Sequence, residues 1–80
     1  MGKSVYSKEY KALTRLLREV RLEAGLTQQD VADKLRKPQS FIAKYESGER
    51  RLDVIEFIAI SRVLQSPADV LLRRLLRMAN

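Results

Sequence analysis

The sequence predicts an all-α fold of five short helices, and three observations support this prediction. Apolar residues recur three and four positions apart in five segments, as in helices that bury one face. Residues suited to a helix start precede these segments, and Gly25 and Gly48 stand where helix ends favour a positive φ. The chain has 80 residues, of which 45% are hydrophobic, so we expect one compact domain over residues 1–80.

The first predicted helix begins after Ser7, whose hydroxyl can cap it. Its core-facing stripe consists of Tyr10, Leu13, Leu16, Leu17 and Val20. The basic residues of this segment, Arg21 included, are expected on the other, solvated faces. Gly25 should end the helix, and Leu26 should turn back toward the core. Residues 1–6 show no periodicity, so we expect a frayed, flexible arm, with contact to DNA as the alternative.

Residues 27–48 predict two short helices joined by a tight turn. Thr27 is placed to cap the first helix, and Asp30 can reach back to the amide of that cap. Pro38 cannot continue this helix but is a favourable start for the next one. The apolar stripe runs through both helices as Val31, Ala32, Leu35, Ile42 and Tyr45. Two short helices with such a turn form the helix-turn-helix unit, which lays its second helix in the major groove of DNA.

Several residues in and around this stretch also occupy positions typical of one known family. They are Gly25, Leu26, Thr27, Gln28, Ala32, Leu35, Ile42, Glu46 and Gly48. This pattern resembles the helix-turn-helix family of the Cro and cI-type phage repressors, and the resemblance runs from about residue 13 to residue 72. It implies a five-helix domain like that of lambda repressor. Two positions depart from the family pattern: Arg36-Lys37-Pro38 replaces a Gly-apolar-Ser turn, and Gln65 replaces the Gly that often follows the fourth helix.

The net charge of +6 and the isoelectric point near 10.1 favour a polyanionic partner, with nucleic acid the leading candidate. A basic surface that serves only solubility is the alternative on charge alone. The chain has no cysteine and no histidine, which removes disulfides, the usual general base and the usual metal ligand. We therefore expect no enzyme activity and no cofactor or metal. No apolar run is long enough to span a membrane, so we expect a cytoplasmic protein that does not enter the membrane.

The outward face of the second motif helix is expected to read bases. This face carries Gln39, Ser40 and Lys44. A glutamine amide can pair with adenine, a serine hydroxyl can donate to or accept from a base, and a lysine ammonium can reach guanine. Matching positions read bases in the family that the motif resembles. Phe41 is a fourth candidate, which could pack on a thymine methyl group or fold back onto the domain.

Phosphate contacts are expected at both ends of this helix and at the start of the helix before it. The candidates are Gln28, Arg36, Lys37, Arg50 and Arg51, with solvated side chains as the alternative. Gln28 follows the helix cap, where free amides attract an anion, and the resemblance implies a phosphate contact there. The resemblance also implies that Glu46 holds the loop that follows it.

The last two predicted helices carry more apolar residues than one core needs. Asp53 can cap the fourth, and its expected inward face is Val54, Phe57, Ile60, Ser61 and Leu64. The fifth begins at Pro67 and carries Val70, Leu71, Leu72, Leu75, Leu76 and Met78. Exposed apolar surface of this extent is typical of a site that another protein surface covers. We therefore expect a homodimer through residues 54–78, with an interface formed by Ile55, Ile58, Leu72 and Leu76. The alternative is that the end of the fifth helix frays and its leucines cover the core of the monomer.

These features together predict a sequence-specific regulator that binds double-stranded DNA, at an inverted-repeat operator, as a homodimer. The alternative is an antitoxin-type interaction module that masks a protein partner such as a toxin and binds DNA secondarily. A polymerase is another candidate protein partner. A third reading, a binder of RNA or of membrane surfaces, lacks the aromatic stacking platform of the first and the exposed aromatic stripe of the second.

Overall fold

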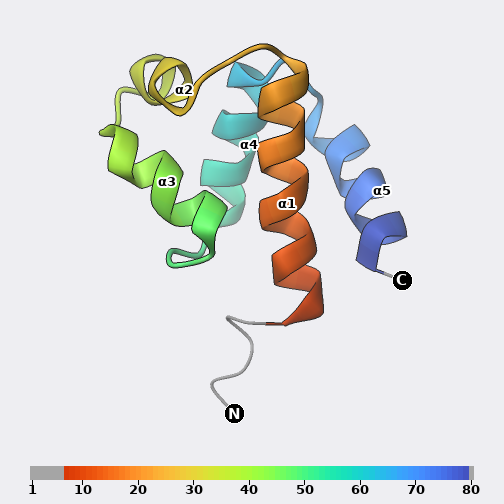
Figure 1. Cartoon of the computed structure of the whole chain (residues 1–80). Coiled ribbons are helices and arrows are strands. Elements are labelled where there is room, and N and C mark those ends of the chain that lie inside the picture. Colours follow the sequence, from red (N-terminus) through yellow and green to blue (C-terminus); the bar gives the residue numbers. More distant parts are fainter. Residues whose placement is uncertain (1–6, 80) are drawn as a thin grey trace.

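The part of the chain that the structure describes contains five α-helices joined by short loops. The computed structural model describes residues 7–79, with α1 (Lys8–Glu23), α2 (Gln28–Leu35), α3 (Gln39–Ser47), α4 (Val54–Val63) and α5 (Ala68–Ala79) (Figure 1). No strand occurs among these residues, and none of the helices is long and apolar enough to cross a membrane. The five-helix, all-α prediction is confirmed. The predicted arm at residues 1–6 lies outside the described residues.

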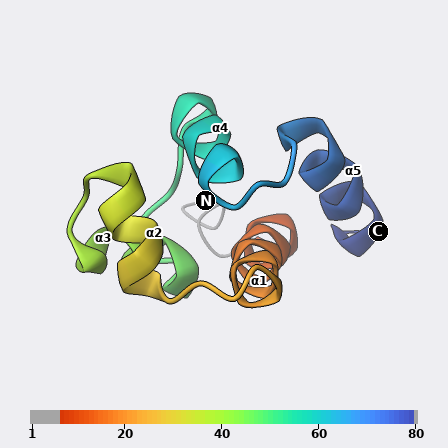
Figure 2. The ribbon, with the colours of Figure 1, turned by 90° about the horizontal axis from the view of Figure 1, so that it is seen from above.

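The helix-turn-helix pair and the last helix lie on opposite sides of the molecule. Seen from above in Figure 2, α2 and α3 occupy one side, α5 the other, and α1 and α4 lie between them. α5 packs on α1 and α4, whereas α2 packs on α3 and α4, and α3 packs on α1. The predicted DNA-reading helix and much of the predicted dimer surface are therefore separated by the body of the domain.

Buried side chains from all five helices form one core. Its members are Leu16, Leu17, Val20, Val31, Ala32, Ile42, Tyr45, Phe57, Ile60, Leu64 and Leu71. They follow the predicted stripes, but Val54, which was predicted to face inward, is 71% exposed. Val54 is the first residue of α4 and lines a groove that is open to solvent, so the prediction that placed it in the core was wrong.

The predicted capping residues start three of the helices. The Ser7 hydroxyl accepts a hydrogen bond from a backbone amide of α1. At α2 the Thr27 hydroxyl accepts from the Asp30 amide (3.0 Å), and the Asp30 carboxylate accepts from the Thr27 amide (2.8 Å). Asp53 and Glu56 form the same reciprocal pair at α4, at 2.7 and 2.9 Å. These bonds satisfy amides that have no partner within a helix, so short helices begin at defined residues.

The other two helices begin one residue away from the prediction. Pro38 is the residue before α3, with no side-chain capping bond, instead of being its first residue. α5 begins at Ala68, one residue after Pro67. The carbonyl of Pro67 nevertheless accepts from the Leu71 amide at 3.0 Å, so the proline still opens the first turn of the helix.

Two helix ends use a left-handed residue that is not glycine. Arg36 follows α2 with φ 58°, and Gln65 follows α4 with φ 57°. In both turns the amide of the next residue donates to the helix carbonyl five positions earlier, at 3.0 Å. These are the two positions at which the sequence departs from the glycine of the Cro and cI-type pattern. The backbone of the family turn is thus kept with side chains that disfavour it, at a cost of about 1–2 kcal/mol per residue.

Candidate nucleic-acid interface

The three polar residues predicted to read bases share one exposed face of α3. Gln39 and Ser40 lie in its first turn and Lys44 one turn further, and all three are exposed. On the opposite face Ile42 and Tyr45 are buried and hold the helix to the core. The helix therefore presents amide, hydroxyl and ammonium groups from a rigidly held backbone, as a recognition helix requires.

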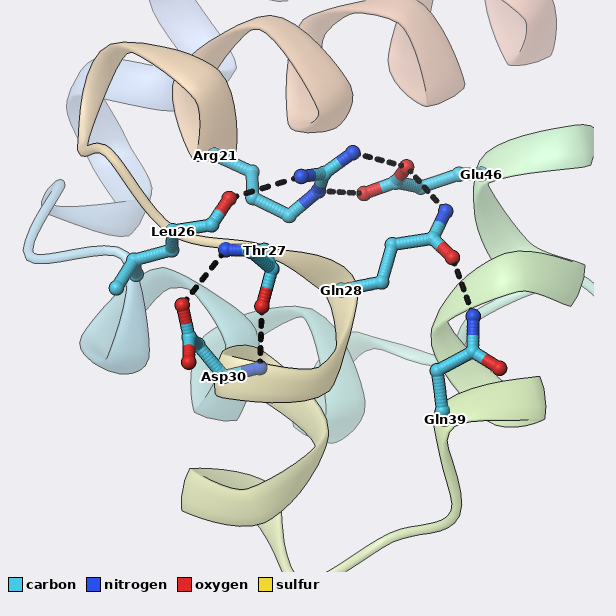
Figure 3. Close-up of polar contacts among 7 residues, drawn as sticks. All are labelled: Arg21, Leu26, Thr27, Gln28, Asp30, Gln39 and Glu46. Carbon is cyan, nitrogen blue, oxygen red and sulfur yellow. Dashed lines mark hydrogen bonds and ion pairs between the residues drawn. The ribbon is translucent and has the colours of Figure 1, made fainter.

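A buried ion pair ties α3 to the end of α1. Arg21 Nε donates to Glu46 Oε2 at 2.7 Å and Arg21 Nη2 to Glu46 Oε1 at 3.1 Å, and these side chains are 8% and 4% exposed. Arg21 Nη1 also donates to the carbonyl of Leu26, in the loop before α2, at 2.8 Å (Figure 3). The hydrogen bonds to Glu46 raise the pKa of Arg21 above its ordinary value. Three segments of the chain are therefore held together at one point.

Two sequence predictions about this pair were wrong. Arg21 was expected on a solvated face, but it follows Leu17 by four positions and shares the buried face of α1. A charge in that position needs a partner, and Glu46 supplies one. Glu46 was expected to hold the loop after α3, but its carboxylate binds Arg21 and Gln28 instead. The spacing from Leu17 is the sequence signal that would have placed Arg21 on the buried face.

Gln28 extends this chain of hydrogen bonds to the recognition helix. Its Nε2 donates to Glu46 Oε1 at 3.0 Å, and its Oε1 accepts from Gln39 Nε2 at 2.6 Å (Figure 3). Because a carboxylate only accepts, Gln28 must turn its nitrogen to Glu46 and its oxygen to Gln39. Gln39 is thereby oriented, and its own oxygen points away from Gln28. An oxygen and a second N–H of one amide are the two groups that pair with adenine.

Phe41 packs back onto the domain. It is half-buried, and its ring meets that of Tyr45 edge to face, with 5.7 Å between centroids and 75° between planes. The Lys37 ammonium lies 5.4 Å and the Arg50 guanidinium 4.7 Å from the centroid of the Phe41 ring. The structure therefore shows the packed arrangement, which the sequence left open beside thymine contact. The ring also positions two cations at the rim of α3.

The loop after α3 is held by a second ion pair, between Arg50 and Glu56. Arg50 Nη1 and Nη2 donate to the two oxygens of Glu56 at 3.0 and 2.9 Å, and these side chains are 41% and 24% exposed. Arg50 Nη1 also donates to the carbonyl of Arg51 at 2.9 Å, and the Arg50 carbonyl accepts from Tyr10 Oη at 2.9 Å. The hydrogen bonds between the side chains raise the pKa of Arg50 and lower that of Glu56. No pattern in the sequence predicted that Tyr10 and Glu56 hold this loop.

The basic residues predicted to bind phosphates stand at both ends of α3. Arg36 and Lys37 are exposed before it, and Arg50 and Arg51 follow it. The Arg51 guanidinium stacks on the ring of Tyr10, 4.4 Å from its centroid. Desolvation by burial raises the pKa of Tyr10.

The described side chains include no group of three or more acidic residues placed to hold a metal ion.

The apolar residues predicted to form a dimer interface are mostly exposed, on α4 and α5. Ile55 is 73%, Leu72 48% and Leu76 67% exposed. Ile58 is half-buried and lines a shallow hollow at the α4–α5 turn. Leu72 lines a different depression, an apolar groove formed with Leu13, Leu52, Asp53, Val54, Phe57 and Leu75. The structure thus adds Val54 to the exposed apolar surface and separates Ile58 from Leu72.

A helix-turn-helix pair whose second helix exposes polar residues between basic clusters defines a class of DNA-binding regulators. The helix-turn-helix family model matches residues 17–71, more than half of the chain. The chain belongs to the Cro/cI-type helix-turn-helix family and is a DNA-binding transcription regulator of the XRE type. Regulators of this family are typically not enzymes.

Solved structures share this fold along nearly the whole chain. An XRE-family like protein from Pseudomonas syringae pv. tomato str. DC3000 is 44% identical, with a TM-score of 0.86 over 96% of this chain and 94% of that one. The wild-type restriction-modification controller protein C.Esp1396I is 25% identical, with a TM-score of 0.83 over 90% and 94%. The same controller has also been solved as a tetramer in complex with its natural 35 base-pair operator. That structure is 25% identical, with a TM-score of 0.83 over 91% of this chain and 96% of that one. No curated protein sequence matches the chain.

Proposed function

We propose that the protein regulates transcription by binding an inverted-repeat operator as a homodimer, with α3 in the major groove. The observation that carries this proposal is the orientation of Gln39 by a chain of hydrogen bonds that starts at the buried Arg21–Glu46 pair. An oriented amide at the first turn of α3 loses little conformational freedom when it meets a base. The operator complex of C.Esp1396I, a relative with the same fold, supports this use of the motif.

Sequence is read in this proposal by the exposed face of α3. The Gln39 amide pairs with adenine through its oxygen and its second N–H. Ser40 donates to or accepts from a neighbouring base, and Lys44 reaches the O6 and N7 of guanine one turn further along. Phe41 contributes by positioning Lys37 and Arg50, and a contact of its edge with a thymine methyl group stays a prediction.

Phosphates are bound around this face. Gln28 lies at the N-terminal end of α2, where the second N–H of its amide and the backbone N–H groups of the first turn meet one phosphate. Arg36 and Lys37, which precede α3, contact the DNA backbone, and so do Arg50 and Arg51, which follow α3. These contacts set the register of the helix in the groove, and they make affinity dependent on salt.

Two copies are needed because one recognition helix reads only a few base pairs. The exposed apolar surface of α4 and α5 supplies a self-complementary patch in this proposal. Ile55, Leu72 and Leu76 form it together with Ile58 and the groove beside Val54. A two-fold dimer of this kind sets its recognition helices about 34 Å apart, which is one turn of DNA.

Selection of bound sequences from random duplexes tests this proposal. We expect the enriched sites to be inverted repeats whose half-site centres are about one helical turn apart. Enrichment of a single unrepeated half-site would contradict the homodimer. Absence of any enriched sequence would contradict sequence-specific binding itself.

The interface has its own test in Ile55→Glu combined with Leu76→Glu, because both side chains are exposed and absent from the core. We expect a folded monomer with unchanged helix content and roughly 100-fold weaker operator binding, as the second binding event is lost. Leu22→Glu is the matched control, since Leu22 is 53% exposed at the end of α1 and lies outside the proposed interface. A double variant that still sediments as a dimer would place the interface elsewhere.

A second candidate function, an antitoxin-type module that masks a different protein, is favoured by the same exposed apolar surface on α4 and α5. Sizing of the pure protein separates the two candidates. A dimer at micromolar concentration supports the stand-alone regulator. A monomer that forms a stable complex with the product of a neighbouring gene supports the interaction module.

A further inference from the structure

We propose that Glu56 competes with DNA phosphates for Arg50, so that Arg50 binds a phosphate on the operator but stays paired with Glu56 on random-sequence DNA. This inference rests on the proposed function and adds a competition within the same surface. An acidic side chain that pairs with a DNA-facing arginine lowers affinity for all DNA, because either the pair must break or the phosphate contact is lost. Glu56 would therefore give the operator complex one phosphate contact per subunit more than the complex with random-sequence DNA.

The geometry shows that Glu56 occupies the groups that a phosphate would use. Both terminal nitrogens of Arg50 donate to Glu56, at 3.0 and 2.9 Å, in a fork. A phosphate binds an arginine with the same bidentate geometry. Arg50 Nη1 is also committed to the carbonyl of Arg51. Arg50 can bind a phosphate through this fork only by leaving Glu56.

The carboxylate stays in place when the arginine leaves. Glu56 Oε1 accepts from the Asp53 amide at 2.9 Å, and the Glu56 amide donates to Asp53 Oδ1 at 2.7 Å. This reciprocal cap fixes Glu56 to the first turn of α4 independently of Arg50. Glu56 therefore remains a competitor for the guanidinium and does not follow it toward the DNA.

The loop is arranged so that only the Arg50 side chain needs to move. Its carbonyl is held by Tyr10 Oη at 2.9 Å, and its amide donates to the Lys44 carbonyl at 3.2 Å. The Arg50–Glu56 pair is partly exposed, and exposed pairs contribute little net stability, so a phosphate can displace the carboxylate. Contacts elsewhere on the operator must bring that phosphate within reach, and random sequences meet this condition less often.

Glu56→Gln tests the proposal, because glutamine keeps an oxygen for the Asp53 amide and removes only the charge. Affinities of the full chain for a random-sequence duplex and for the selected operator are measured as functions of salt. We expect the random-sequence slope of log affinity against log salt to steepen by about 0.9 per subunit, one phosphate contact. The slope for the operator should stay unchanged while affinity for both duplexes rises, and Arg50→Ala should abolish the steeper random-sequence slope and the rise in affinity.

Glu49→Gln is the matched control, since Glu49 is an exposed carboxylate of the same loop and the change of charge is equal. Arg50→Lys supplies a second variant if the glutamine protein unfolds. Lysine cannot form the bidentate pair, so it should also raise random-sequence binding above that of wild type. Equal effects of Glu56→Gln and Glu49→Gln, or an effect that persists with Arg50→Ala, would overturn the inference.

Weaker binding of Glu56→Gln to both duplexes would also overturn it, because Glu56 would then hold Arg50 toward the phosphate. Failure of the proposed function looks different. In that case the wild-type protein would show no preference for any selected sequence.

Discussion

The two arginine–glutamate pairs that hold α3 have similar bonds but different surroundings. Arg21–Glu46 and Arg50–Glu56 are both bidentate, with distances between 2.7 and 3.1 Å. The first pair is buried between α1 and α3, whereas the second lies partly exposed between the α3–α4 loop and α4. Burial, more than bond geometry, therefore separates a pair that holds the fold from one that can exchange its partner.

The physical reason is the cost of leaving one partner alone. A buried charge without its counterion keeps its full desolvation penalty, so the buried pair acts as a unit. A partly exposed charge is rehydrated when its partner leaves, and its net contribution is small. The buried pair can therefore orient Gln28 and Gln39 without moving, while the exposed pair can yield its arginine to a phosphate.

Breaking the buried pair should change the stability of the protein more than any other substitution considered below. Glu46→Ala should lower the free energy of unfolding by about 3–5 kcal/mol, because it leaves Arg21 buried and unpaired. Urea denaturation measures this loss. The double variant Arg21→Met with Glu46→Leu should recover most of it, since an apolar pair carries no desolvation penalty. Glu56→Gln should lower the free energy of unfolding by only a small fraction of this amount. Equal losses from the changes at Glu46 and Glu56 would contradict the difference between the two pairs.

The next effect concerns the hydrogen bonds that the buried pair supports. Gln39→Ala should weaken operator binding by about 1–3 kcal/mol and relax preference at one or two base pairs. Gln28→Ala should weaken it partly through Gln39, because it removes the bond that orients that amide. The double variant should therefore lose less than the sum of the single losses. Additive losses, or equal losses on random DNA, would show that Gln28 does not act through Gln39.

A smaller effect is expected at the two left-handed helix ends. Gln65→Gly should raise the free energy of unfolding by about 1 kcal/mol and leave DNA binding unchanged, because it relieves backbone strain away from α3. Arg36→Gly should stabilise similarly but flatten the salt dependence of binding by about one phosphate contact. Thermal denaturation and salt titrations measure the two quantities. An unchanged salt slope would remove Arg36 from the interface.

The smallest effect is the acid dependence of stability. Hydrogen bonds from Arg50 lower the pKa of Glu56 from its ordinary 4.5, and the Thr27 amide lowers the pKa of Asp30 from 3.8. The unfolded chain therefore binds more protons than the folded one as pH falls past these values, so stability declines below about pH 5. Glu56→Gln and Asp30→Asn should each flatten this decline in acid unfolding curves. An undiminished decline in both variants would assign it to other carboxylates.

Short-range interactions made much of the fold predictable from the sequence. Thr27 with Asp30, and Asp53 with the start of α4, cap helices through residues three positions apart. Such contacts form wherever a helix starts, so composition and spacing suffice to place them. The apolar stripes predicted the buried residues well, because a 3.6-residue period leaves one face of each helix to the core. Val54 does not follow this rule, because it is the first residue of α4 and lines a groove that is open to solvent.

Neighbouring residues in the chain control the five helices, the turn at Pro38 and the polar face of α3, so the sequence alone was enough to predict them. The partners of the long charged and amide side chains depend instead on how the helices pack. Arg21 and Glu46 are 25 residues apart, and their pairing depends on how α3 packs against α1. The orientation of Gln39 likewise depends on packing, because α2 places the Gln28 amide beside it. A long side chain can reach several partners, and the packing of helices distant in sequence selects among them.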